Sequence, residues 1–375
     1  MKILVVGMSQ NKGGIESVIH NYFCYFNKDN IQFDFLSHFQ HIAFEDDFKK
    51  FGSKMYYIPT KHTNYFAYKK AITTFFKENS KFYDAIWVNL LQLTNIDYLK
   101  LAKRYGIKHR IIHSHNNKSG YKGVSKAIRG CIHEWNKLRL NHYATDFWAC
   151  SEDAANFFYS RTDKKESRII YNAINVEDFK FSEKDRLEIR KKYHLENTIV
   201  IGNIGRLQMQ KNQLFLISTM QKLIKKIPNV KLVLVGDGPD KELLEAKINK
   251  FKLENNVIMV GLQDNVQPYL SSFDLFVFPS LFEGLGVAAL ESEANGVPVI
   301  ASTGVPKNVK INSNFLFADL NKGVNYWAEL VQKVVKKDSS RISYDVIKDE
   351  FSRTHFDIKK ESNILEKLFL DMQEC

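Results

Sequence analysis

Short apolar runs alternate with longer stretches of helical periodicity along the chain. In the first half, five apolar runs predict buried strands, at residues 3–6, 33–36, 85–88, 110–113 and 146–149. A glycine pair and an aromatic-rich helix at about 15–26 follow the first run. Strands that alternate with helices indicate a parallel sheet covered by helices on both faces.

The alternation starts again near residue 199. Further strands are predicted at 199–204, 231–235, 257–260, 275–278 and 299–301, with helices at 213–227, 241–251 and 285–294. We therefore expect an α/β protein with two Rossmann-like, doubly wound parallel-sheet domains, joined near residues 170–185. The tail from about 357 to 373 is predicted to be a helix with Ile358, Leu365, Leu368, Phe369 and Met372 on one face.

The segment Pro279–Glu291 (PSLFEGLGVAALE) carries the strongest functional signal. It follows the predicted strand 275–278, at the end of the sheet where ligands of such folds bind. The N–H groups at the start of the next helix attract phosphate. Glu283 and Glu291 are about two helical turns apart and can accept hydrogen bonds from sugar hydroxyls. An isolated pair of glutamates would also fit a loop residue and a solvated helix residue.

Three further motifs follow strands. Arg206 and Lys211 can hold a diphosphate, although ordinary surface cations would look the same. Gly13 and Gly14 let the backbone approach a ligand, or form a plain tight turn. His113-Ser114-His115 ends the strand 110–113, and a histidine there can face a cleft and titrate or hydrogen-bond near neutral pH, or simply be packed.

The bulk composition narrows the classes of protein. The 375 residues are 44% hydrophobic and 26% charged, which is typical of a globular chain, and their net charge of +12 favours anionic partners. The four cysteines are scattered and suggest neither a zinc site nor a disulfide framework. No apolar run approaches the length of a spanning helix, so we expect any membrane contact to be peripheral.

The stretch 100–140 is strongly basic. It holds eleven Lys and Arg residues against one acid, Glu134, with Tyr105, Tyr121 and Trp135 interleaved. That pattern fits anionic lipid headgroups, RNA or a solvated surface. P-loop, H-E-x-x-H and G-x-S-x-G motifs are absent, and Asp46-Asp47, taken to lie in a polar loop, is not a convincing metal site, so no metal is expected.

These motifs together resemble the retaining glycosyltransferases of family 4, which have the GT-B fold. The resemblance covers nearly the whole chain through IIYNAINVEDF (169–179), GNIGRLQMQKN (202–212), LVGDGP (234–239) and the E-x7-E element of Glu283 and Glu291. It is closest to transferases of bacterial capsule and exopolysaccharide synthesis. One departure is the run 302–307, which has Lys307 where many members have a carboxylate.

The resemblance implies two domains that face each other across a cleft. Residues 1–172 would bind the acceptor, residues 173–355 the nucleotide-sugar donor, and a helix at 356–375 would cross back to the N-terminal domain. Arg206 and Lys211 would bind the pyrophosphate, Glu291 the ribose and Glu283 the transferred sugar. Backbone at Gly284, Leu285 and Gly286 and at Gly13 and Gly14 would approach the donor. The residues implied in catalysis are His115, Glu283, Arg206 and Lys211, with His113 a possible acceptor contact.

The expected activity is transfer of a hexosyl group from a nucleotide diphosphate sugar, a UDP-sugar, to a polyprenyl-linked saccharide, without metal or other cofactor. The expected location is the cytoplasm, peripheral on the inner face of a bacterial cell membrane. A sugar-nucleotide epimerase or phosphorylase on the same scaffold is an alternative, which product analysis would separate. Nucleic acid is not expected as a partner, although the basic charge leaves a nucleic-acid-binding protein as a further alternative.

Overall fold

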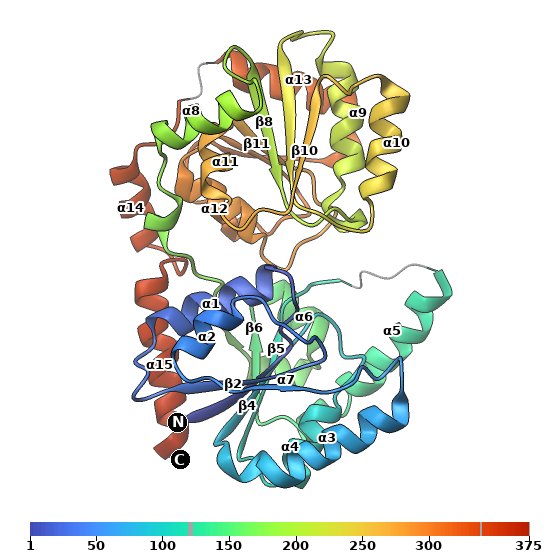
Figure 1. Cartoon of the computed structure of the whole chain (residues 1–375), viewed down its shortest axis with the longest axis vertical. Helices are drawn as coiled ribbons and strands as arrows, with labels where there is room; N and C mark the ends of the chain where they lie inside the picture. The colour runs from blue at the N-terminus through green and yellow to red at the C-terminus, as the bar shows by residue number, and fades with distance from the viewer. Residues whose placement is uncertain (119–122, 338–339, 375) are drawn as a thin grey trace. The chain divides into compact units, whose positions relative to one another are not determined.

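The computed structural model describes residues 1–118, 123–337 and 340–374 (Figure 1). The chain divides into two compact units. Unit 1 comprises Met1–Ala173 and Ile358–Cys375, and unit 2 comprises Ile174–Asp357. The boundary between the units falls inside the junction predicted at residues 170–185.

Over the described residues, unit 1 has a seven-stranded parallel sheet in the order β3-β2-β1-β4-β5-β6-β7. Its strands are β1 (Lys2–Val6), β2 (Gln32–Ser37), β3 (Met55–Tyr57), β4 (Ala85–Leu90), β5 (His109–Ser114), β6 (Asp146–Ala149) and β7 (Arg168–Ile169). The five predicted strands are confirmed. The short edge strands β3 and β7 were not predicted.

The helices of unit 1 lie on both faces of this sheet. They are α1 (Gly14–Tyr25), α2 (Glu45–Lys50), α3 (Tyr65–Asn79), α4 (Asp97–Arg104), α5 (Gly123–Lys137), α6 (Glu152–Phe158), α7 (Arg161–Lys165) and α15 (Ile358–Glu374), with 3₁₀ turns η1 (Ser80–Phe82) and η2 (Leu140–His142). Successive residues of β1 enter different cores: Ile3 and Val5 join one buried cluster, and Leu4 and Val6 the other. A strand buried on both faces gives the continuous apolar run seen in the sequence.

Unit 2 repeats the architecture. In its described part, a six-stranded parallel sheet has the order β10-β9-β8-β11-β12-β13. The strands are β8 (Ile199–Ile204), β9 (Val230–Val235), β10 (Val257–Gly261), β11 (Leu275–Phe278), β12 (Val299–Ser302) and β13 (Phe315–Ala318). The helices are α8 (Glu183–Lys192), α9 (Gln213–Leu223), α10 (Lys241–Phe251), α11 (Gln267–Ser272), α12 (Val287–Asn295), α13 (Gly323–Lys336) and α14 (Tyr344–Ser352), with 3₁₀ turns η3 (Val176–Phe179), η4 (Met209–Lys211), η5 (Lys307–Val309) and η6 (Leu320–Lys322).

The predicted fold class, two parallel-sheet α/β domains, is confirmed, with small differences at element ends. Helix α9 ends at Leu223 rather than Ile227, a few residues before Pro228, which disfavours helical backbone at Ile227. Helix α12 begins at Val287 rather than Leu285, because Gly286 adopts a left-handed conformation with φ of 95°.

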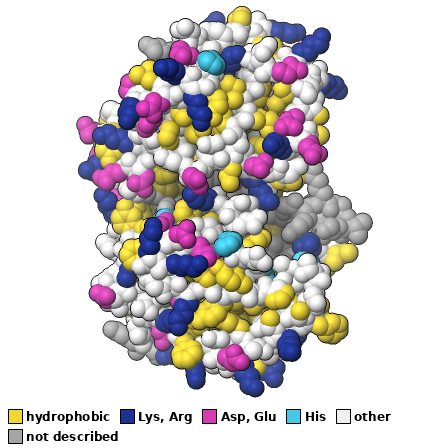
Figure 2. Space-filling model, viewed as in Figure 1, with side chains coloured by type: hydrophobic (Ala, Val, Ile, Leu, Met, Phe, Trp, Pro, Cys, Tyr) yellow, Lys and Arg dark blue, Asp and Glu magenta, His cyan; other side chains and the backbone are white. Residues whose placement is uncertain are grey.

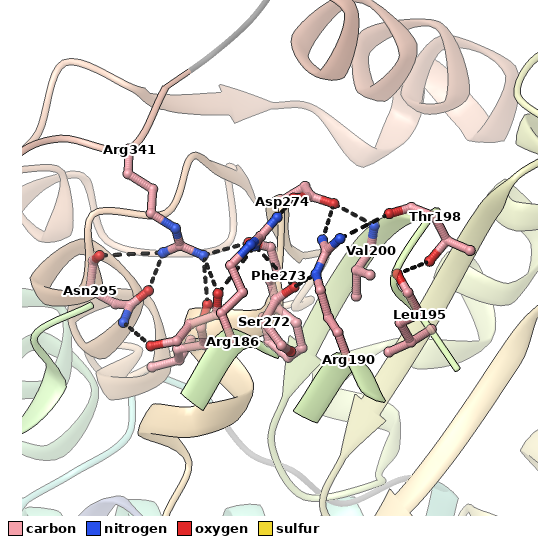
Figure 3. A network of polar contacts seen from close by, with 12 residues as sticks. Arg186, Arg190, Leu195, Thr198, Val200, Ser272, Phe273, Asp274, Asn295 and Arg341 are labelled. Atoms are coloured by element: carbon pink, nitrogen blue, oxygen red, sulfur yellow. Dashed lines mark hydrogen bonds and ion pairs between the residues drawn. The ribbon is translucent and has the colours of Figure 1, made fainter. Parts of the chain in front are cut away.

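An arginine cluster fixes the end of β11 that is opposite to the predicted ligand end (Figure 3). Arg186 and Arg190 of α8 both form ion pairs with Asp274, which directly precedes β11. Arg341 donates to the backbone carbonyls of Leu270, Ser271 and Phe273 at the C-terminal end of α11. Cations are favoured at the negative end of a helix dipole, so this cluster ties α8, α11 and β11 together.

The C-terminal helix α15 belongs to the core of unit 1, where it packs beside α1 (Figure 1). The Phe369 ring is fully buried and makes edge contacts with Phe26, Phe33 and Trp87, with ring centroids 6.0, 6.4 and 5.8 Å away. Aromatic contacts of this kind add to the free energy gained from burial. The last helix is therefore needed to complete the first domain.

We predict that Phe369→Ala lowers the unfolding free energy of unit 1 by about 3–5 kcal/mol, because it leaves a cavity among aromatic rings. The same substitution at Ile364, which is 51% exposed on α15, should change it by less than about 0.5 kcal/mol. Urea unfolding followed by tryptophan fluorescence measures both changes. Equal effects of the two substitutions would show that α15 does not contribute through its buried face.

Candidate active site

Lys211 and Glu283 form an ion pair where β8 and β11 end. Lys211 Nζ lies 2.7 Å from Glu283 Oε1, and both side chains are largely buried. Gln210 Nε2 donates to Glu283 Oε2 at 3.4 Å. An ion pair removed from water is stable only when its members satisfy each other, so the two loops that carry them are held in register.

Glu291 lies about one turn into α12, and its carboxyl interacts with the charge of Lys211. Solvent reaches part of its side chain, but desolvation by the surrounding protein outweighs the opposing charge of Lys211 and raises the pKa of Glu291 to about 7. In the carboxylate–lysine cluster of Lys211, Glu283 and Glu291, one cation thus interacts with two acids, as an ion pair with Glu283 and through its charge with Glu291. A carboxyl whose pKa is raised this far is typical of ligand-binding and catalytic sites.

Backbone contacts hold the loop between β11 and α12. Leu281 N–H donates to Gln210 O at 2.8 Å, and Glu283 N–H donates to Gly304 O at 3.0 Å. A Cβ at Gly304 would lie 2.4 Å from Leu281 O, so a side chain has no room there. From the sequence, Gly304 was only one residue of the run 302–307 that departs from the family pattern, whereas the structure gives it a positioning role.

Helix α12 begins with an N-cap that supplies no side-chain hydrogen bond. Gly286 is that N-cap, and it is buried together with Gly284 and Leu285. Ala289 N–H donates to Gly286 O at 2.8 Å, whereas the two amides before it in the first turn have no i−4 partner within the helix, and the helix dipole adds positive potential there. This backbone lies next to Glu283 in sequence and can accept a phosphate.

Glycines also bring the neighbouring strand ends close together. A Cβ at Gly236 would lie 2.2 Å from Gly205 O, and Leu207 N–H donates to Asp237 O at 3.0 Å. Asn212, with left-handed φ of 56°, donates its side-chain amide to Pro279 O at 3.1 Å. The predicted residues of unit 2 therefore gather at one edge of its sheet, with the side chain of Arg206 exposed to solvent.

In unit 1, the predicted glycine loop leads into α1. Gly13 is the N-cap of α1, and Gly14 has open space where a side chain would lie. The buried carboxylate of Glu16 accepts the Ser9 N–H at 2.8 Å, and a Cβ at Gly13 would lie 2.7 Å from it. Glu16 thus holds the loop, a role that sequence reasoning missed because a first-turn acid looks like an ordinary helix residue.

His115 lies at the end of β5 and its hydrogen bonds fix its tautomer. The Asn89 amide donates to Val6 O and Trp87 O, so its carbonyl oxygen Oδ1 faces His115 Nε2 at 2.8 Å. His115 Nε2 must therefore carry the proton, and Nδ1 has a lone pair without a partner among the described residues. Burial lowers the pKa of His115 to about 3.

His113 is fully buried against Trp87 and Trp148, and its Nδ1 accepts from Trp87 Nε1 at 3.3 Å. Burial, and then the neighbouring His115, lower the pKa of His113 well below its ordinary value. Of the alternatives that the sequence left open, hydrogen bonding and packing describe these two histidines and titration near neutral pH does not, because burial disfavours the charged form of both rings. Both act as neutral hydrogen-bonding groups, and their roles toward substrate stay predictions.

The described residues include no group of three or more His, Cys, Asp or Glu side chains placed to hold a metal ion. Asp46 and Asp47 lie on α2 rather than in a loop, and Asp47 pairs with His20 and Lys50. In the basic stretch, Tyr121 and Lys122 lie outside the described residues, as does the side chain of Lys126. Figure 2 shows Lys and Arg side chains spread over the visible face of both units.

Comparison with known protein families gives a match within unit 2. Residues 185–348 match the family model of glycosyl transferases group 1. The matched residues, called the group 1 domain below, include Arg206, Lys211, Glu283 and Glu291.

The similarity extends beyond the group 1 domain. The chain is 26% identical over 371 residues to the putative glycosyltransferase EpsF of Bacillus subtilis, covering 97% of this chain and 95% of EpsF. It is 25% identical over 319 residues to the UDP-Gal:alpha-D-GlcNAc-diphosphoundecaprenol alpha-1,3-galactosyltransferase of Escherichia coli, covering 74% and 79% of the two chains. The group 1 domain and these relatives support a glycosyltransferase.

Solved structures agree on the fold. Anabaena HepE in complex with UDP-glucose aligns with a TM-score of 0.80 and 20% identity, covering 99% of this chain and 100% of HepE. The two parallel-sheet domains match the GT-B fold of glycosyltransferases.

We predict that Glu291→Gln stabilises the free protein by about 2 kcal/mol near pH 8 and has little effect near pH 5. The pKa is raised to about 7 in the folded state, so the folded protein holds a proton that the unfolded chain releases. The wild type therefore loses stability as the pH rises from the ordinary range of a glutamate through 7, whereas the glutamine variant does not. Urea unfolding at the two pH values measures this, and an equal difference at both would contradict it.

Proposed function

We propose that this chain is a retaining, family 4-type glycosyltransferase that moves a hexosyl group from a UDP-sugar to a polyprenyl-linked saccharide in capsule or exopolysaccharide synthesis. The observation that carries the proposal is the carboxylate–lysine cluster beside the N-terminus of α12. One cation, the amides at a helix N-terminus and two carboxylates are what a ligand with a diphosphate and hydroxyl groups requires.

The proposed donor roles follow from this geometry. The α12 amides, Arg206 and Lys211 bind the diphosphate, Glu291 accepts hydrogen bonds from the ribose, and Glu283 does so from the transferred sugar. Lys211 pairs with Glu283 in the free protein, so the arriving diphosphate competes with Glu283 for its charge. Arg206 has an exposed side chain and is available without breaking an internal contact.

The proposed reaction breaks the bond between the anomeric carbon and the β-phosphate oxygen and forms a bond to the acceptor hydroxyl on the same face. The leaving phosphate accepts the proton of that hydroxyl. Arg206, Lys211 and the α12 amides stabilise the developing negative charge, so the proposal needs no metal or other cofactor. His115, neutral and with a free Nδ1 lone pair, is proposed to orient a hydroxyl group in unit 1 rather than to carry a charge.

The names of the relatives support the donor and acceptor. HepE was crystallised with UDP-glucose, and the E. coli relative is named for a UDP-galactose donor and a diphosphoundecaprenol acceptor. We further propose that the protein acts in the cytoplasm at the inner face of a bacterial cell membrane, with residues 1–172 on the acceptor side. None of the helices among the described residues is both long and apolar enough to cross a bilayer.

The direct test is a panel of UDP-sugars and polyprenyl diphosphate-linked saccharides, with products separated by chromatography and their linkage read by NMR. We expect an acceptor-dependent product with the anomeric configuration of the donor. A new sugar nucleotide formed without acceptor would instead indicate an epimerase, and release of a sugar phosphate would indicate a phosphorylase.

We predict that Arg206→Gln weakens UDP binding about tenfold without changing thermal stability, because a charge-assisted phosphate contact is lost and no internal contact is broken. The matched control is Arg353→Gln, an exposed arginine of unit 2 that pairs only with the exposed Asp349 in the ion pairs described. Titration calorimetry with UDP measures both. Equal affinities of the two variants and the wild type would refute a role for Arg206 in donor binding.

A further inference from the structure

Helix α5 of unit 1 carries a row of apolar side chains on its outer side. Ile128, Ile132 and Trp135 are 58%, 40% and 62% exposed, at spacings of four and three residues that align them on one helix face. Leu138, directly after the helix, is 73% exposed. Full burial of such a side chain would contribute about 1.5–3 kcal/mol, so a helix that exposes a row of them is a candidate for contact with another apolar phase.

The inner side of α5 is polar and is fixed by hydrogen bonds. His133 Nδ1 accepts the Leu93 N–H at 3.1 Å, and the Asn136 amide donates to Leu93 O at 2.7 Å. His133 Nε2 donates to Phe157 O at 3.1 Å, and the side chains of His133 and Asn136 are buried. Rotating the apolar row inward would break these buried hydrogen bonds, so the fold itself holds the row outward.

Cations lie at the C-terminal end of this row. The Arg139 guanidinium lies over the Trp135 ring, 5.5 Å from its centroid. The Tyr143 ring has Lys100, Lys103 and Arg139 within 5.6, 6.0 and 6.0 Å of its centroid. The α5 face, defined as Ile128, Ile132, Trp135, Leu138, Lys100, Lys103 and Arg139, therefore joins an apolar row to a cationic cluster.

We infer that the α5 face docks unit 1 onto an anionic lipid bilayer. Tryptophan and aliphatic side chains beside lysine and arginine are the composition of interfacial helices, whose apolar side sits at the boundary of headgroups and acyl chains. Each cation near an anionic surface contributes about 1 kcal/mol. A second copy of the chain would bring two clusters of the same charge together, and RNA would leave the apolar row uncovered.

Docking through this face would bring the protein to a lipid-linked acceptor. The choice of that acceptor rests on the proposed function. Helix α5 begins eight residues after His115, so in sequence the face follows closely on the candidate acceptor-side residues of β5. A bilayer-bound unit 1 would meet an acceptor whose polyprenyl chain is held in the same bilayer. Binding to the bilayer is nevertheless a separate property, which can be measured without donor or acceptor.

The test is co-sedimentation of the full chain with vesicles. The wild type should bind vesicles that contain phosphatidylglycerol and bind pure phosphatidylcholine vesicles at least about tenfold more weakly, because the cations lose their partners. The double variant Ile132→Ser/Trp135→Ser should lose at least about tenfold in affinity for the anionic vesicles. The matched control is Leu187→Ser/Leu243→Ser, two leucines of unit 2 that are 58% and 53% exposed and should leave binding unchanged.

A charge variant, Lys100→Gln/Arg139→Gln, should lose about tenfold or more in affinity for the anionic vesicles, since two cations are removed. Unchanged vesicle binding in either the apolar or the charge variant would overturn the inference. So would a dimer in light scattering that the apolar variant abolishes, or RNA binding without vesicle binding, because either would assign the face to another partner.

UDP titration of the same variants separates the two proposals. Lost vesicle binding with wild-type UDP affinity is the result expected for a docking face. Vesicle binding by a wild type that binds no UDP and no UDP-sugar would refute the proposed function and leave the docking face in place.

Discussion

The ion pair between Lys211 and Glu283 is the interaction on which the candidate donor site depends. It joins loops from two strand ends, β8 and β11, at 2.7 Å in a largely buried setting. Removing one member of such a pair costs about 3–5 kcal/mol because the other is left buried with an unmatched charge. Glycines hold the neighbouring loops against this pair: Gly236 lets the loop after β9 approach the loop after β8, and Gly304 lets the loop after β12 approach the loop after β11.

The carboxylate–lysine cluster is energetically unfavourable in the free protein, and a bound ligand can relieve this cost. Two carboxylates share one lysine, and burial keeps the pKa of Glu291 near 7 instead of in the ordinary range of a glutamate. A site optimised for stability alone would not bury a carboxyl with so little compensation. Sugar hydroxyls would give the carboxylates hydrogen-bond donors while a diphosphate engages Lys211, so the unfavourable features of the free site become favourable contacts in the proposed complex.

The sequence predicted the position of candidate site residues wherever a motif directly follows a buried strand. The continuous apolar runs of β8 and β11 predicted those strands, and with them the position of Arg206, Lys211, Glu283 and Glu291 at one sheet edge. The edge strands β3, β7 and β13 escaped prediction because they are short or only partly buried, so their apolar signal is weak. Sequence spacing gave neither the partner of Lys211 nor the neutral state of His115, since both follow from three-dimensional burial. The outward apolar row of α5 was hidden for the same reason, because periodicity identifies an apolar helix face but not the side on which it lies.

A crystal structure of the protein with UDP is the most direct test of the central claim, that the carboxylate–lysine cluster is a nucleotide diphosphate site. We predict diphosphate oxygens within hydrogen-bonding distance of the α12 amides and of Lys211 Nζ, with Lys211 drawn away from Glu283 and the ribose hydroxyls on Glu291. UDP bound elsewhere, with the Lys211–Glu283 pair intact at 2.7 Å, would contradict the account.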